Sequence, residues 1–454
     1  MASFKNSVQD CKLIGTMQDN QSKVMRRLTA IENIDSVIYA WTMLFLVTGF
    51  FTPLSFSALN GIPFFLVLLL LVARKERYTK GKRFSRLLVF SSISYVFAIS
   101  IVLIASPYSK SSLLSNALFL ATTIVLFTYA EIKEDEKITR AFYVICSIVL
   151  TVTYAIFILF PAVFIEMVGP TTSALNYAPL LLGEPDKNWT GVFIFLYLCL
   201  SIKKKWYYGI FLGCCYPLLY FGRQYLMMAA LLFVCLFILK QLKKRQAGNT
   251  VKKQEQPKPL AYFFVFVVTT VIVIAGSFYW ADNVVGENTA SYKSTLNDDS
   301  NAIRTLSNVY AVKLIASDSS FFIYGYDSDV FVQLGISPDN TSPDENVLIE
   351  GLWRLVVPHE EAINTLLKEG ALVTLTYYLL VSIVLARVAS SRKDYCILVA
   401  YFAGSMLLSS MFKDEYLLLL CIVLFVSCKQ VKSNRVPIIG SVRNHKFATK
   451  DRRQ

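Results

Sequence analysis

The chain has 454 residues, of which 55% are hydrophobic and 17% charged, and its formal charge at pH 7 is +14. Soluble globular proteins carry about 25% charged residues, so the composition argues against a soluble protein. The two histidines and nine cysteines show no zinc-ligand spacing, so we expect no metal site. The basic residues are scattered over seven short segments, which argues against nucleic-acid binding.

Long apolar runs recur along the chain, and a membrane-spanning helix needs about 20 apolar residues. The runs lack the alternation of β-barrel strands. The sequence therefore predicts an all-α polytopic membrane protein with about 12 transmembrane helices. We expect these spans near residues 36–54, 57–74, 87–106, 113–130, 141–166, 178–202, 206–222, 224–240, 260–280, 370–388, 394–411 and 414–429.

Lys and Arg concentrate in alternate connecting segments, and such segments face the cytoplasm. This bias predicts that both termini are cytoplasmic, and the polar opening segment shows no cleavable signal. The segment between the ninth and tenth spans holds fourteen Asp or Glu against five Lys or Arg. We therefore expect a cytoplasmic tail (1–35), nine helices (36–280), a large, partly helical periplasmic loop (281–369), three helices (370–429) and a basic cytoplasmic tail (430–454).

Two arginines on the predicted outer side are candidates for chemistry. Arg223 stands where two apolar runs meet, and a charge at membrane depth usually has a partner or a function. The alternative is an arginine whose side chain merely reaches the membrane–water interface. Such arginines are expected mainly on the cytoplasmic side, whereas Arg223 is predicted to lie on the outer side. Arg304 lies near the start of a predicted amphipathic helix over 303–314, where a surface ion pair is the alternative.

His359 follows Pro358 and precedes Glu360 and Glu361. Proline followed by acidic residues is typical of a helix start, so we expect a helix that begins near 358 and leads into the span at 370–388. The histidine is then either an ordinary helix-start residue or a proton acceptor at the mouth of a cavity, because imidazole titrates near neutral pH.

Four stretches together resemble the bacterial O-antigen ligase and polymerase superfamily of membrane glycosyltransferases. "EPDKNWTGVFIFLYLCL" (184–200), which contains Asn188, resembles the start of a mid-chain span, and "FGRQYLMMAALLFVCLFIL" resembles the arginine-containing start of a later one. "IRTLSNVYAVKLIASDSSFFIYGYDSDVF" (303–331) resembles an outer-loop segment that ends in a Gly-x-Gly turn, of which only Gly325 remains. "PHEEAINTLLKEG" resembles the Pro-His segment; Glu360 replaces the usual Asn or Ser.

The resemblance implies an enzyme of the bacterial inner membrane that transfers glycans from undecaprenyl diphosphate at the periplasmic face. Such transfer inverts the anomeric centre and needs no cofactor and no metal. His359, Arg223 and Arg304 would be catalytic, with Arg354, Asn188 and Glu360 as further substrate contacts. Partners would be the lipid-linked oligosaccharide, a glycan or lipid acceptor, the bilayer, and a chain-length regulator or other polysaccharide-assembly proteins.

Three alternatives remain open at this stage. A polymerase joins repeat units, whereas a ligase transfers the finished chain to lipid A core, and no motif separates them. A lipid-linked glycan flippase would call for charged residues within spans or broken helices at the midplane, and the apolar runs show no central charge. A non-catalytic membrane partner is the third.

Overall fold

The computed structural model describes the helical parts of the chain and a few short segments beside them. The described residues are 36–48, 50, 86–105, 111–129, 133–162, 187–219, 223–245, 259–280, 307–309, 311–312, 315–316, 319–325, 358, 360–408 and 411–426. Over these residues the protein is all-α, as the sequence predicts.

The apolar runs form helices because a helix satisfies its own backbone hydrogen bonds in an apolar setting. In chain order they are a helix at Ser36–Thr48, α4 (Arg86–Ala105), α5 (Ser111–Ile124) with a π-helical continuation η1 (Val125–Tyr129), α6 (Glu136–Leu159), α8 (Lys187–Lys204), α9 (Tyr207–Leu219), α10 (Arg223–Arg245), α11 (Pro259–Trp280), α14 (Ser319–Tyr324), α17 (Glu361–Glu369), α18 (Ala371–Val388), α19 (Arg392–Ser405) and α20 (Asp414–Phe425).

Five helices are long and apolar enough to cross a membrane: α4, α6, α10, α11 and α18. Large apolar side chains on α4 and α11 point outward, as Phe90 and Phe264 do with exposed fractions of 67% and 61%. Exposed apolar surface of this extent is typical of contact with lipid. Together these features indicate a membrane protein. The count of twelve spans stays a prediction, and the span at 57–74 lies outside the described residues.

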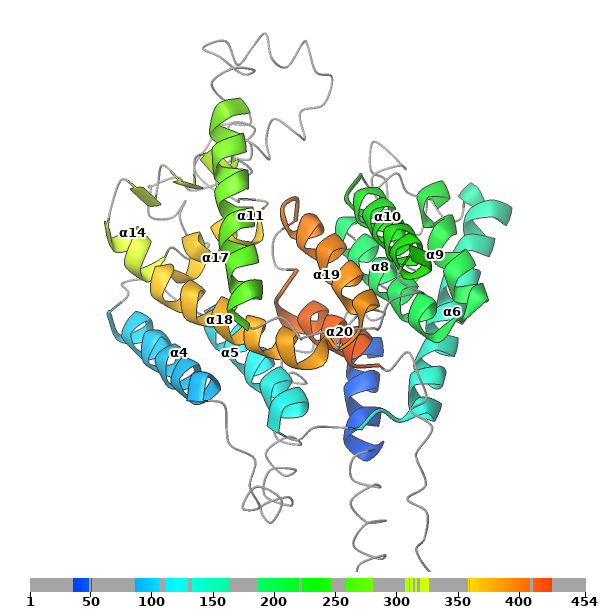
Figure 1. Cartoon of the computed structure of the whole chain (residues 1–454), viewed down its shortest axis with the longest axis horizontal. Coiled ribbons are helices and arrows are strands. Elements are labelled where there is room, and N and C mark those ends of the chain that lie inside the picture. The colour runs from blue at the N-terminus through cyan, green and yellow to red at the C-terminus, as the bar shows by residue number, and fades with distance from the viewer. Residues whose placement is uncertain are drawn as a thin grey trace, which may run out of the picture.

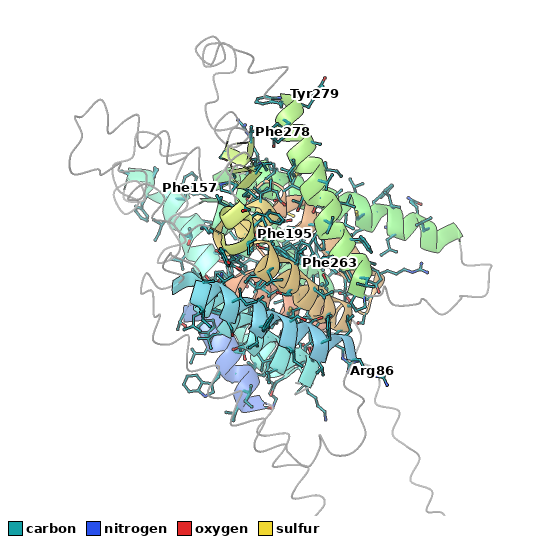
Figure 2. The ribbon with its side chains drawn as sticks, turned by 90° about the vertical axis from the view of Figure 1, so that its left-hand side faces the viewer. Arg86, Phe157, Phe195, Phe263, Phe278 and Tyr279 are labelled. Atoms are coloured by element: carbon teal, nitrogen blue, oxygen red, sulfur yellow. The ribbon has the colours of Figure 1, made fainter. Side chains whose placement is uncertain are left out.

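The helices form two groups joined by α19 and α20 (Figure 1). In one group, α18 packs against α4 and α11, and α14 packs against α17; in the other, α8 packs against α9 and α10. The middle of α8 is buried on every side, and Figure 2 shows its Phe195 at the centre of the bundle, whereas Tyr279 lies at the protruding end of α11. A helix that is apolar all round belongs in a core, so α8 is the central helix.

A buried ion pair fastens one end of the bundle. Lys203 Nζ at the end of α8 donates to Asp394 Oδ1 at 2.7 Å and to the Leu424 carbonyl oxygen at 2.7 Å. Asp394 also completes a capping box with Ser391 at the start of α19. The pair therefore joins the ends of three helices, α8, α19 and α20, and the sequence assigns all three ends to the same side.

A second buried group fastens the opposite ends of neighbouring helices. Glu369 Oε1, at the end of α17, accepts hydrogen bonds from Asn116 Nδ2 at 2.6 Å and from Lys413 Nζ at 2.9 Å. Asn116 lies in the first turns of α5, and Lys413 directly precedes α20. These three residues also belong to ends that the sequence assigns to one side, opposite to that of Lys203.

Candidate active site

The segment after Pro358 forms a short helix, as the acidic residues at its start predict. Glu360 is the N-cap of α17: its Oε2 accepts the Ile363 backbone N–H at 2.6 Å, and its Oε1 accepts the Thr270 hydroxyl at 3.4 Å. The helix therefore begins at Glu361, close to the predicted position. His359 itself lies outside the described residues, between the buried Pro358 and this cap.

α17 is buried on two faces of different character. Ile363 and Leu367 form a small apolar cluster with Ala311 and Ile315. Two apolar residues of the segment that follows Arg304 therefore pack on α17, the helix that begins two positions after His359. The cluster places Ala311 and Ile315 against α17; Arg304 lies seven positions before Ala311 and is itself outside the described residues.

The other face of α17 is polar, and the side chains of Glu361 and Thr365 on it are hydrogen-bonded inside the protein. Glu361 Oε1 accepts the Tyr378 hydroxyl at 3.0 Å, and its Oε2 accepts the Met411 backbone N–H at 2.6 Å. Thr365, one turn further on, lies 3.1 Å from the same Tyr378 hydroxyl. α17 is thus held on its polar face by hydrogen bonds to α18 and to the turn before α20.

Two glycines join the outer-loop segment to the histidine segment. Gly325 follows α14 with φ +70, and Gly370 separates α17 from α18 with φ +80. The backbones are so close that a Cβ on Gly325 would lie 2.6 Å from Glu369 N, and a Cβ on Gly370 would lie 2.8 Å from Gly325 N. Both glycines occur in stretches that carry the family resemblance, and the structure brings these stretches into contact.

Met411 connects α17 to the start of α10. Its sulfur accepts Gln224 Nε2 at 3.2 Å, while its backbone N–H donates to Glu361. Gln224 is 3% exposed and also donates to the Gly404 carbonyl oxygen at 3.4 Å. Arg223, the residue before it, is the first residue of α10 and is exposed. Two hydrogen bonds, both made by Met411, therefore link the start of α17, which follows His359, to the start of α10, which contains Arg223.

The start of α8 lies beside the start of α10. A Cβ on Gly191 would lie 3.4 Å from Tyr225 Cβ and 3.6 Å from the Tyr216 ring. Asn188 is in the first turn of α8, three residues before Gly191. The four stretches that resemble the glycosyltransferase superfamily thus form two contacting pairs: α8 with α10, and α17 with α14, Ala311 and Ile315. Met411, which belongs to none of these stretches, links the two pairs through its hydrogen bonds to Gln224 and Glu361.

Burial shifts the titration of the two acidic residues at the start of α17, which lie outside the predicted spans. Burial raises the pKa of Glu360 to about 7, against the opposing effect of its capping hydrogen bonds. Burial likewise raises the pKa of Glu361 to about 7, and nearby Lys413 opposes the shift. The two carboxyl groups follow His359 in the chain by one and two positions.

The structure describes three of the six predicted site residues, and these three differ in exposure and position. Arg223 lies at an exposed helix start, Asn188 lies in the first turn of α8, and Glu360 is 1% exposed with both carboxylate oxygens engaged inside the protein. The proposed substrate contact of Glu360 stays a prediction. His359, Arg304 and Arg354 lie outside the described residues; Ala311, seven positions after Arg304, packs on α17, which begins two positions after His359.

Sequence reasoning did not single out the buried polar residues that surround α17. Glu361, Glu369, Lys413 and Asn116 are all less than 10% exposed. The available signal was that Lys413 and Glu369 stand directly at the ends of apolar runs, where a charge needs a partner. Within the described residues, no group of three or more His, Cys, Asp or Glu side chains could hold a metal ion.

The chain matches no protein-family model, no curated protein and no solved structure. The functional argument therefore rests on the residues and on their geometry.

Proposed function

We propose that the protein is a membrane glycosyltransferase that uses glycans linked to undecaprenyl diphosphate, and that it works at the periplasmic face of the bacterial inner membrane. The observation that carries the proposal is the connection through Met411. Its backbone N–H pairs with Glu361 and its sulfur with Gln224, so the helix starts next to His359 and Arg223 belong to one buried network. These are the stretches with the family resemblance that contain a candidate base and a candidate diphosphate ligand.

Arg223 supports the proposal by its chemistry and its place. The leaving group of the reaction is a lipid diphosphate, and the planar guanidinium matches two phosphate oxygens at once. The start of a long helix adds the partial positive charge of its backbone N–H groups. An exposed arginine at the first position of α10 combines both features. Arg304 would supply the second cation, with Arg354 and Asn188 as further contacts.

The proposed reaction needs one proton acceptor. The acceptor hydroxyl attacks the anomeric carbon of the donor sugar, and the bond from that carbon to the diphosphate oxygen breaks. His359 takes the hydroxyl proton, and undecaprenyl diphosphate leaves with the bonding electron pair. The attack inverts the anomeric centre. Positioned bases typically accelerate such steps about 10²- to 10⁴-fold.

The proposed orientation follows from the distribution of basic residues. The segments 74–83, 203–205 and 240–258 would be cytoplasmic, and 281–369 periplasmic. Hydrogen bonds support the alternation because they join ends assigned to one side: Lys203 pairs with Asp394, and Glu369 pairs with Lys413. With both termini in the cytoplasm, the region around α17 would face the periplasm.

Among the members of this class we favour a polymerase over an O-antigen ligase. The two differ in their acceptor, and a deletion strain separates them. Surface glycans that carry single repeat units indicate a polymerase, whereas a bare core with accumulated lipid-linked chains indicates a ligase. Loss of repeat units from the outer leaflet would instead favour a flippase. The buried charges at Glu361, Glu369 and Lys413 stand at helix ends, and a flippase would more typically carry them at mid-span.

Two variants test the assigned roles in such a strain and in purified protein. Arg223→Lys should impair transfer and donor binding, because a point charge does not reproduce a bidentate fork. His359→Ala should cut transfer by about 10²- to 10⁴-fold while donor binding persists. Near-normal transfer by the histidine variant would make His359 an ordinary helix-start residue and remove the base from the mechanism.

A further inference from the structure

Glu361 carries a hydrogen-bond arrangement that capping of a helix does not require. Glu360 is the N-cap of α17, so the side chain of Glu361 does not cap the helix. Its side chain is fully buried, and each carboxylate oxygen accepts one hydrogen bond: Oε1 from the Tyr378 hydroxyl and Oε2 from the Met411 backbone N–H. The second bond, at 2.6 Å, crosses from α17 to a turn fifty residues away.

That turn contacts three parts of the candidate active site. Met411 meets Glu361 through its N–H and Gln224 through its sulfur, and Lys413 meets Glu369 at 2.9 Å. Residues 411–413 therefore hold both ends of α17 and also the start of α10. The turn is itself fixed, because the Tyr401 hydroxyl donates to the Met411 carbonyl oxygen and the Tyr377 hydroxyl to that of Phe412.

We propose that Glu361 is a positioning residue: through Met411 it sets the distance between the His359 end of α17 and the Arg223 end of α10. This inference rests on the proposed function and deepens it. Glu361 touches neither donor nor acceptor in this account. The proposed base and the proposed diphosphate ligand stand at the starts of separate helices, so the reaction requires a constant distance between those helix starts. The bond from Met411 to Glu361 fixes the turn between the helices and thereby that distance.

The expected effect is on turnover more than on binding. A misplacement of about 1 Å between reacting groups can cost about 10²-fold in rate. The donor would still meet Arg223, whose helix start is also held by the bond from Gln224 to the Gly404 carbonyl oxygen. Loss of the Glu361 bond should therefore lower kcat and leave donor affinity unchanged.

Three single variants separate positioning from general stability. Glu361→Leu keeps the volume and leaves the buried Met411 N–H without an acceptor; we expect kcat to fall about 10- to 100-fold. Glu361→Gln keeps an acceptor oxygen for that N–H and should restore most of the rate. Thr365→Val is the matched control: it lies one turn away on the same helix and loses a contact with Tyr378, but it leaves the Met411 bond intact.

A double variant tests the connection from its other end, including the case in which Glu361→Leu folds poorly. Gln224→Leu removes both side-chain bonds of Gln224. If both residues act through Met411, the double variant should lose much less than the product of the two single losses, because interacting sites are not additive. Losses that multiply would overturn the proposal, as would a Glu361→Leu variant that weakens donor binding and turnover equally.

Hydrogen exchange keeps this proposal distinguishable from the proposed function. Exchange at the Met411 amide should accelerate in Glu361→Leu and stay at the wild-type rate in Glu361→Gln and Thr365→Val. Faster exchange should extend to the start of α10. If the protein shows that result but transfers no glycan, the link from Glu361 through Met411 to α10 would stand and the proposed glycosyltransferase function would be rejected. Unchanged exchange in Glu361→Leu, in a protein that does transfer glycan, would reject the positioning role alone.

Discussion

The contact between Gly325 and Gly370 gives a sharp test of how the outer segment is attached to the helices. In Gly370→Ala the backbone would keep φ +80 and ψ 165, a region that side-chain-bearing residues avoid at a cost of about 1–3 kcal/mol. The added Cβ would also overlap with the Ile323 carbonyl oxygen and lie 2.8 Å from Gly325 N. Both neighbours are backbone atoms, and forced repacking of this kind costs about 1–3 kcal/mol more.

The expected loss is therefore about 2–6 kcal/mol in the free energy of unfolding. The matched control is Gly276→Ala, because a Cβ at that helical position meets no atom within 4 Å. Alanine there should leave stability unchanged or raise it by up to about 1 kcal/mol. An unfolding titration of the purified protein in mixed micelles measures both variants. A Gly370→Ala protein as stable as the Gly276→Ala protein would refute the close backbone contact.

Three further predictions concern topology, metals and pH. A cysteine in place of Ser291 should react with a membrane-impermeant thiol reagent in intact spheroplasts, because 281–369 is predicted to be periplasmic; reaction only after permeabilisation would reverse the orientation. Transfer by purified protein should survive EDTA, since arginines replace a metal at the diphosphate; magnesium-dependent recovery would overturn that assignment. The pKa of Glu361 rises from 4.5 to about 7 on folding, so its contribution to stability is fully present below about pH 4.5 and is lost as pH rises through 7. Thermal stability should therefore fall less between pH 5 and 8 in Glu361→Gln than in the wild type, and equal slopes would contradict the burial of this carboxyl.

The sequence predicts the helices because apolar runs of the required length are a strong signal. Each predicted span within the described residues contains a helix, including α4, α10 and α11 at nearly the predicted ends. It does not predict that α8 is central. A run that is apolar on every face suits lipid and a protein core equally well, and only the packing against α9, α10 and α20 decides between them.

The start of α17 was predictable, and its end was not. Proline and acidic residues mark the start, and Glu360 caps it as such residues do. The sequence predicts a helix that leads directly into the span at 370–388. The structure separates α17 from α18 at Gly370, since the close approach of Gly325 requires a glycine with positive φ there. That requirement comes from a segment 45 positions away.

The pairing of the buried charged side chains is the feature of the fold that could least be predicted from the sequence. Asn116 and Glu369 are 253 positions apart, and Lys203 and Asp394 are 191 apart. No periodicity or spacing rule connects such residues; only the folded arrangement shows that these charges at the ends of apolar runs have partners. The same holds for Met411, an apolar residue whose backbone N–H and sulfur join the two candidate helix starts.

Transfer by the isolated protein is the most direct test of the central claim. Wild-type protein and Arg223→Ala would be reconstituted in liposomes with an oligosaccharide linked to undecaprenyl diphosphate, and the lipid-linked products separated by size. The account predicts longer lipid-linked glycans with an inverted linkage and release of undecaprenyl diphosphate by the wild type, and loss of both in the variant. Folded wild-type protein that binds this donor and transfers no sugar from it to a second lipid-linked oligosaccharide or to lipid A core would contradict the account.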